Sequence, residues 1–125
     1  HLRLLNDSAH SVTVMGEAFW LEQAISNVLD NAIEFTPQGK NISVKLSQHQ
    51  QQATLIIKNQ GQAIPDYALP RVFERYYSLP RPESQHKSTG LGLTLVQEVM
   101  ALHQGQVSIH NNDDGVNVTL VFFHH

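Results

Sequence analysis

The chain has 125 residues, of which 41% are hydrophobic and 15% charged, and its formal net charge is -3. This length fits one domain over residues 1–125, and the hydrophobic fraction suffices for a packed core, so wholesale disorder is excluded. The lack of cysteine excludes disulfides, thiolate metal sites and cysteine nucleophiles. No basic cluster offers a footprint for nucleic acid, and no apolar run approaches the roughly 18 residues of a membrane span. We therefore expect neither nucleic acid nor a membrane as a direct partner.

The first half of the chain alternates between strand and helix patterns. Residues 11–15 alternate apolar and polar side chains, which predicts a short strand. Residues 17–35 carry apolar side chains at the spacing of an amphipathic helix, which ends before Pro37. Two further alternating runs, 42–47 and 53–58, are joined by a polar turn and predict a hairpin.

The second half contains a long irregular segment between two predicted helices. A short helix is predicted at 69–75, and residues 76–89 lack any period and contain two prolines, which is typical of a lid. Apolar side chains at helical spacing predict a helix over 90–103, followed by strands at 106–110 and 116–123. This order predicts an α+β fold, a two-layer α/β sandwich. Its mixed, mainly antiparallel sheet of about five strands would carry three helices on one face.

Two asparagines mark one side of the predicted helix 17–35. Asn27 and Asn31 are four residues apart, so both lie at the edge of the apolar stripe, with Glu34 beside them. Asparagine is a poor helix former, so the pair needs an explanation. Either the side chains hydrogen-bond to neighbouring backbone groups, or their amide oxygens serve as ligands for Mg²⁺, which prefers hard oxygen ligands.

Two glycine-containing segments could approach a ligand closely. Residues 59–65, Asn-Gln-Gly-Gln-Ala-Ile-Pro, follow a predicted strand, where a polar side chain and a glycine can meet a flat ligand. Residues 87–93, Lys-Ser-Thr-Gly-Leu-Gly-Leu, lead into a predicted helix, whose free N–H groups and dipole suit a polyphosphate. Taken singly, the first segment also fits an ordinary turn, and the second an ordinary helix start.

Together, in this order, these segments resemble the ATP-binding catalytic domain of bacterial sensor histidine kinases, within the ATPase superfamily shared with gyrase, Hsp90 and MutL. The likeness covers nearly the whole chain. Residues 21–37 resemble the family's N box, 59–64 its first glycine box, 72–77 its F box and 88–95 its second glycine box. The F box and the Gly-Leu-Gly-Leu sequence favour the kinase branch. Residues 77–81 are further similar to carbon-source-responsive sensor kinases of enteric bacteria.

The resemblance implies a Bergerat-type fold that binds ATP and Mg²⁺ between the asparagine helix and a lid at about 76–89. It implies that Asn31 holds Mg²⁺ and that Asn59 faces the adenine amino group. Ile64 and Leu93 would flank the base. The nucleotide-binding residues that it implies are Asn27, Asn31, Glu34, Phe35, Asn59, Gly61, Ala63, Ile64, Arg75, Tyr77, Arg81, Lys87, Ser88, Thr89, Gly90, Leu91, Gly92 and Leu93.

The resemblance also implies a role in two-component signalling. Such a domain transfers the γ-phosphoryl group of ATP to a histidine on a partner dimerisation domain, which then supplies a response regulator. None of the eight histidines has the sequence context of that phosphoacceptor. We therefore expect the phosphoacceptor domain, the sensor and the membrane segments to lie outside this chain, which would be a cytoplasmic portion of a membrane-anchored kinase. No residue of the chain itself is then a catalyst beyond positioning ATP.

Several departures from the family pattern keep a second interpretation open. Asn59 stands where the first glycine box normally has Asp, and Ala63 where it has its second glycine. Glu34 stands where many relatives carry a cation, and Lys87 and Ser88 where further glycines often lie. A neutral acceptor binds a base amine less strongly than a carboxylate does. The alternative is a degenerate nucleotide-binding domain that acts as a regulatory interaction module with weak or no ATP turnover.

Overall fold

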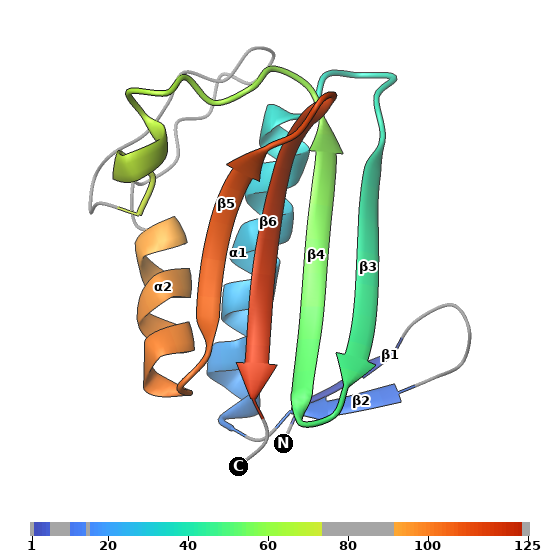
Figure 1. Cartoon of the computed structure of the whole chain (residues 1–125), viewed down its shortest axis with the longest axis vertical. Coiled ribbons are helices and arrows are strands. Elements are labelled where there is room, and N and C mark those ends of the chain that lie inside the picture. The colour runs from blue at the N-terminus through green and yellow to red at the C-terminus, as the bar shows by residue number, and fades with distance from the viewer. Residues whose placement is uncertain (1, 6–10, 15, 74–91, 124–125) are drawn as a thin grey trace.

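The computed structural model describes residues 2–5, 11–14, 16–73 and 92–123, which form six strands, two α-helices and one 3₁₀ helix (Figure 1). In chain order the elements are β1 (Leu2–Leu5), β2 (Ser11–Val14), α1 (Ala18–Phe35), β3 (Ile42–His49), β4 (Gln52–Gln60), the 3₁₀ helix η1 (Leu69–Arg71), α2 (Gly92–Leu102), β5 (Gln106–Asn111) and β6 (Gly115–Phe123).

Four of the strands build one antiparallel sheet in the order β3-β4-β6-β5. Two hairpins make up this sheet, β3-β4 and β5-β6, and they join through the pairing of β4 with β6. Helices α1 and α2 pack against one another and against the same face of the sheet (Figure 1). The predicted α+β class and the two-layer sandwich are confirmed.

The numbers of strands and helices differ from the prediction. Ser11–Val14 does not extend the main sheet but pairs with Leu2–Leu5, a strand that the sequence pattern did not predict. The main sheet therefore has four strands, all antiparallel, rather than about five in a mixed arrangement. Alternation shows that a segment is extended but not which strand it pairs with. The helix predicted at 69–75 is found as a 3₁₀ helix at Leu69–Arg71, and residues 74 and 75 of the prediction lie outside the described residues.

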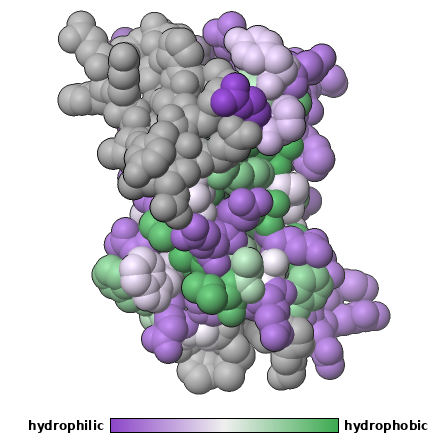
Figure 2. All heavy atoms as spheres, turned by 90° about the vertical axis from the view of Figure 1, so that its left-hand side faces the viewer, coloured by the Kyte–Doolittle hydropathy of each residue, from purple (hydrophilic) through white to green (hydrophobic). Residues whose placement is uncertain are grey.

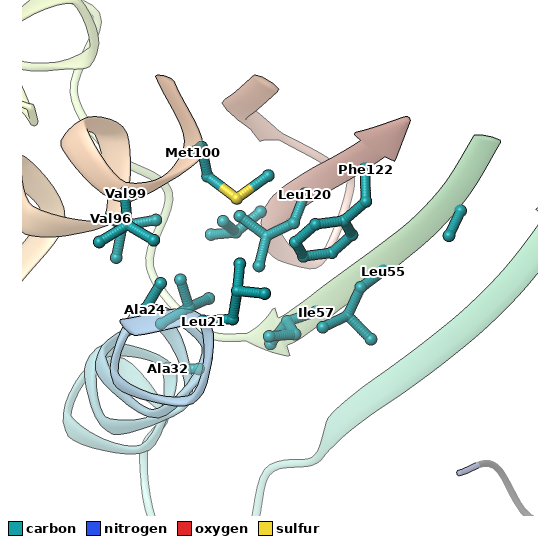
Figure 3. Packing of buried hydrophobic residues seen from close by; sticks show 13 residues of the cluster. Leu21, Ala24, Ala32, Leu55, Ile57, Val96, Val99, Met100, Leu120 and Phe122 are labelled. Carbon is teal, nitrogen blue, oxygen red and sulfur yellow. The ribbon is translucent and has the colours of Figure 1, made fainter. Parts of the chain in front are cut away.

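The core lies between the sheet and the two helices. Along β6 the buried residues alternate with partly exposed ones, so one face of this strand points into the core. Figure 3 shows side chains from α1, α2, β4 and β6 pointing toward one another. The buried cluster consists of Leu21, Ala24, Val28, Ala32, Ala53, Leu55, Ile57, Val96, Val99, Met100, Val118, Leu120 and Phe122. Burial of each large side chain in this cluster stabilises the fold by about 1.5–3 kcal/mol.

His103 joins the end of α2 to the beginning of α1. Its Nε2 accepts a hydrogen bond from the Glu17 N–H at 3.1 Å, and its Nδ1 lies 2.8 Å from the Val99 carbonyl oxygen. Because a carbonyl oxygen only accepts, Nδ1 is the donor to Val99 in this arrangement. A Cβ at Gly16 would lie 2.2 Å from the His103 ring, so glycine allows this close approach. His103 thus fixes how the two helices meet.

Candidate functional site

The C-terminal end of α1 meets the turn that follows β4. A Cβ at Gly61 would lie 2.9 Å from the Phe35 carbonyl oxygen and 3.2 Å from Pro37 Cδ, so the two segments are in contact. Asn31 precedes Phe35 by about one helical turn. The structure therefore brings the asparagine helix and the turn 61–64 to the same end of the molecule, the end toward which β4 points in Figure 1.

Asn59 is the one polar side chain that is buried among the described residues, with 5% of its surface exposed. It pairs with Ile42 on β3 and with Val116 on β6, on the face of the sheet that carries the helices. Within the described part of the chain its Nδ2 has no hydrogen-bond partner. A buried amide without an acceptor costs about 1–3 kcal/mol, so such a group calls for a further partner, such as a ligand or a water.

The turn between β5 and β6 supports the segment after β4. The Gly61 N–H donates a hydrogen bond to the Asp114 carbonyl oxygen at 2.9 Å. The Asn111 side chain binds both backbone groups of Ile64, at 2.9 Å to the N–H and 2.8 Å to the carbonyl oxygen. A Cβ at Gly115 would lie 1.9 Å from the Asn59 carbonyl oxygen, so only glycine fits there. Three contacts from one hairpin thus define the position of this turn.

Sequence reasoning missed Asn111 and Gly115 as parts of the site. They follow Ile64 by about 50 residues, and the run Asn-Asn-Asp-Asp-Gly at 111–115 has the composition of any hairpin turn. Only the register between β4 and β6, which pairs Gln60 with Gly115, brings them to the site. The sequence signal for Gly115 was a glycine directly after a turn, and a glycine in that position does not indicate which residue it contacts.

The start of α2 is linked to the segment after η1. The Thr94 hydroxyl donates a hydrogen bond to the Phe73 carbonyl oxygen at 2.8 Å. Leu93, one residue earlier, is partly buried and packs against the core. Figure 2 looks onto the side of the molecule that carries α2, where hydrophobic and hydrophilic side chains are interspersed.

The predicted site residues divide into two groups. Those within the described residues are Asn27, Asn31, Glu34 and Phe35 on α1, Asn59 on β4, Gly61, Ala63 and Ile64 in the turn, and Gly92 and Leu93 at the start of α2. The side chains on α1 are half-buried, and Ala63 is exposed. Arg75, Tyr77, Arg81, Lys87, Ser88, Thr89, Gly90, Leu91 and the predicted lid 76–89 lie outside the described residues. The roles of both groups stay predictions.

Two features are absent from the part of the chain that the structure describes. Among the described residues, no three His, Cys, Asp or Glu side chains are grouped so that they could hold a metal ion. In the same part of the chain, no helix has the length and apolar character needed to cross a membrane.

Comparison with known proteins identifies relatives over most of the chain. The family described as histidine kinase-, DNA gyrase B- and HSP90-like ATPases matches residues 16–124. The chain is 49% identical over 104 residues to the sensor protein CreC of Escherichia coli K12, covering 83% of this chain and 22% of CreC. It is 32% identical over 109 residues to the sensor histidine kinase CusS of Escherichia coli O157:H7, covering 86% of this chain and 23% of CusS. The chain thus spans less than a quarter of the length of either relative. The predicted similarity to an enteric sensor kinase is confirmed by the match to CreC.

Solved structures agree in fold. The mycobacterial sensor histidine kinase MprB superposes with a TM-score of 0.77 at 32% identity, covering 88% of this chain and 74% of that one. A complex of the histidine kinase ThkA with the response regulator protein TrrA contains a domain of the same fold, with a TM-score of 0.73 at 20% identity, covering 90% of this chain and 30% of that one.

Proposed function

Because the chain belongs to the family of histidine kinase-, DNA gyrase B- and HSP90-like ATPases, we propose that it binds Mg²⁺-ATP and presents the γ-phosphoryl group to a histidine on a partner domain. The kinase branch is supported by relatives that are sensor proteins and sensor histidine kinases. The observation that carries the proposal is Asn59, a buried amide whose Nδ2 has no partner in the described chain and which lies beside the turn at Gly61.

An adenine ring fits the chemistry of Asn59. Its carboxamide offers one acceptor oxygen and two donor hydrogens. The oxygen can accept a hydrogen bond from the exocyclic amine of adenine, and Nδ2 can donate one to a ring nitrogen. Both groups of the amide then find partners, and the cost of the unpaired Nδ2 disappears when the base binds. Ile64, whose backbone is held by Asn111, is the apolar residue of this turn that we assign to the face of the base.

The remaining parts of the nucleotide would contact α1 and the start of α2. Bound Mg²⁺ neutralises charge on the phosphates, and the amide oxygen of Asn31 is the group on α1 that we assign as its ligand. An α-helix leaves its first N–H groups without partners inside the helix, so the start of α2, an 11-residue helix beginning at Gly92, is where we expect the phosphate oxygens to bind. The chain positions ATP and stabilises charge, whereas the attacking imidazole comes from the partner domain.

The partners that we propose follow from the relatives. The phosphoacceptor histidine would lie in a dimerisation domain of the same kinase, and a response regulator would receive the phosphoryl group from it. A kinase with a domain of this fold forms a complex with the response regulator TrrA, which supports the second step. We place the domain in the cytoplasmic part of a membrane-anchored kinase, and we retain residues 76–89 as the lid over the nucleotide.

Calorimetric titration of the domain with ATP, in the presence and absence of Mg²⁺, tests the proposal. We expect binding that depends on Mg²⁺, and we expect the Mg²⁺ dependence to disappear in Asn31→Ala. The matched control is Ser26→Ala, an exposed position on the same helix, which should bind as the parent does. Binding that is equally strong without Mg²⁺, or a full Mg²⁺ effect in Asn31→Ala, would contradict the assignment of Asn31.

The second candidate function is an interaction module with a degenerate nucleotide pocket. It is favoured by one observation, the neutral amide at Asn59 in place of the carboxylate that the family pattern has there. This candidate predicts no binding at millimolar ATP by the parent chain. It also predicts that binding returns when Asn59→Asp and Ala63→Gly are combined.

A further inference from the structure

Asn111 makes two hydrogen bonds to one residue of the turn after β4. It is the last residue of β5 and pairs with Val116, so its side chain lies on the face of the sheet that carries the helices. Its Oδ1 accepts from the Ile64 N–H at 2.9 Å, and its Nδ2 donates to the Ile64 carbonyl oxygen at 2.8 Å. The residue is half-buried, so these bonds are partly shielded from water.

The two hydrogen bonds from Asn111 take the place of those that a neighbouring strand would make to Ile64. Gln60 is the last residue of β4, and beyond it the chain leaves the ladder with β6. The N–H and the carbonyl of Ile64 would normally need a neighbouring strand, and the carboxamide of Asn111 supplies the same donor and acceptor as a peptide group. Only Asn and Gln side chains carry both groups in this arrangement. Asp lacks the donor, and apolar residues lack both.

We infer that Asn111 is a positioning residue for nucleotide binding: by fixing the backbone of Ile64 it sets the position of the turn that faces the adenine base. This inference rests on the proposed function, because Ile64 acts on the base only if a nucleotide binds there. The Gly61 N–H is anchored separately, to the Asp114 carbonyl oxygen at 2.9 Å. The turn is thus held at both ends by one hairpin, at Gly61 through a backbone group and at Ile64 through the side chain of Asn111.

Two substitutions remove the hydrogen bonds between Asn111 and Ile64 to different extents. Asn111→Asp keeps the acceptor for the Ile64 N–H but places an oxygen against the Ile64 carbonyl. Asn111→Leu has a similar size and makes neither bond. The matched control is Val107→Ala, on the same strand and face, because Val107 packs on the core and lies four residues from Asn111, about 13 Å along the strand, so its truncation weakens the fold as a whole.

The first measurement is amide hydrogen exchange in the nucleotide-free domain. In Asn111→Leu the Ile64 amide should exchange about tenfold faster relative to a core amide such as that of Leu120. In Val107→Ala, exchange at both amides should rise together, because the change is global. An Ile64 amide that keeps its protection relative to Leu120 in Asn111→Leu would overturn the anchoring role.

The second measurement is the Kd for Mg²⁺-ATP at a temperature where each variant is folded. We expect about a tenfold weaker Kd for Asn111→Leu, a similar or smaller loss for Asn111→Asp, and no change for Val107→Ala. If the parent binds Mg²⁺-ATP and both Asn111 variants bind equally well, the inference is wrong and the proposed function stands. If the parent does not bind Mg²⁺-ATP, the proposed function is wrong, and so is the role of Asn111 in nucleotide binding. Hydrogen exchange at Ile64 does not change that conclusion.

Discussion

Asn59→Asp should change stability and ATP affinity in opposite directions. At 5% exposure, a carboxylate at this position loses most of its hydration. Burying it without a partner costs more than the about 1–3 kcal/mol of a neutral group, and each kcal/mol lowers Tm by about 4 °C for a domain of this size. When ATP binds, the same carboxylate accepts from the adenine amine. A charged acceptor exceeds a neutral one by about 1–2 kcal/mol, which corresponds to about a tenfold gain in affinity.

Thermal unfolding of the nucleotide-free domain and calorimetric titration with Mg²⁺-ATP measure the two effects. The matched control is Asn41→Asp, which adds the same charge at an exposed position and should alter neither quantity by much. A lower Tm combined with tighter ATP binding is the expected result. If Asn59→Asp left ATP affinity unchanged while it lowered Tm, Asn59 would be a buried residue that does not face the base.

Two further predictions concern the residues that hold the site together. Gly115→Ala should lower the free energy of unfolding in urea by about 3 kcal/mol, because its Cβ would lie 1.9 Å from the Asn59 carbonyl oxygen. Gly39→Ala, with nothing within 4 Å but with φ at +86°, should cost only about 1 kcal/mol, and equal losses would refute the close-contact explanation. His103→Phe should cost about 1 kcal/mol because the Glu17 N–H loses its acceptor. The same change at exposed His49 should cost less, and a smaller effect at His103 than at His49 would contradict this role.

The elements predicted best from the sequence are those whose pattern repeats over many residues. The helix expected at 17–35 is found at Ala18–Phe35, because apolar side chains recur along it at helical spacing and four of them, Leu21, Ala24, Val28 and Ala32, are buried in the core. Both hairpins of the main sheet were predicted in the same way, from alternation on either side of polar turns. The asparagine helix and the glycine turn could be assigned to one site only through the family resemblance, since neither motif specifies a partner alone.

The features that escaped prediction depend on contacts between distant segments. β1 pairs with β2 because the N-terminal segment folds back on itself. The alternation of apolar and polar residues does not indicate which strands pair. The bonds from Asn111 to Ile64 span 47 residues and exist only because β4 and β6 pair in one register. The unpaired amide of Asn59 likewise depends on its burial, whereas the family resemblance indicated only that Asn59 stands where the first glycine box normally has Asp.

Whether Mg²⁺-ATP occupies the end of α1 and the turn after β4 is tested most directly by amide chemical shifts of the labelled domain. On addition of Mg²⁺ and a non-hydrolysable ATP analogue, the amides of Asn31, Gly61 and Ile64 should shift. Those of Lys45 and Thr119, on the face of the sheet away from the helices, should stay in place. Shifts confined to that outer face, or unchanged amides at Gly61 and Ile64 with saturating nucleotide, would contradict the proposed site.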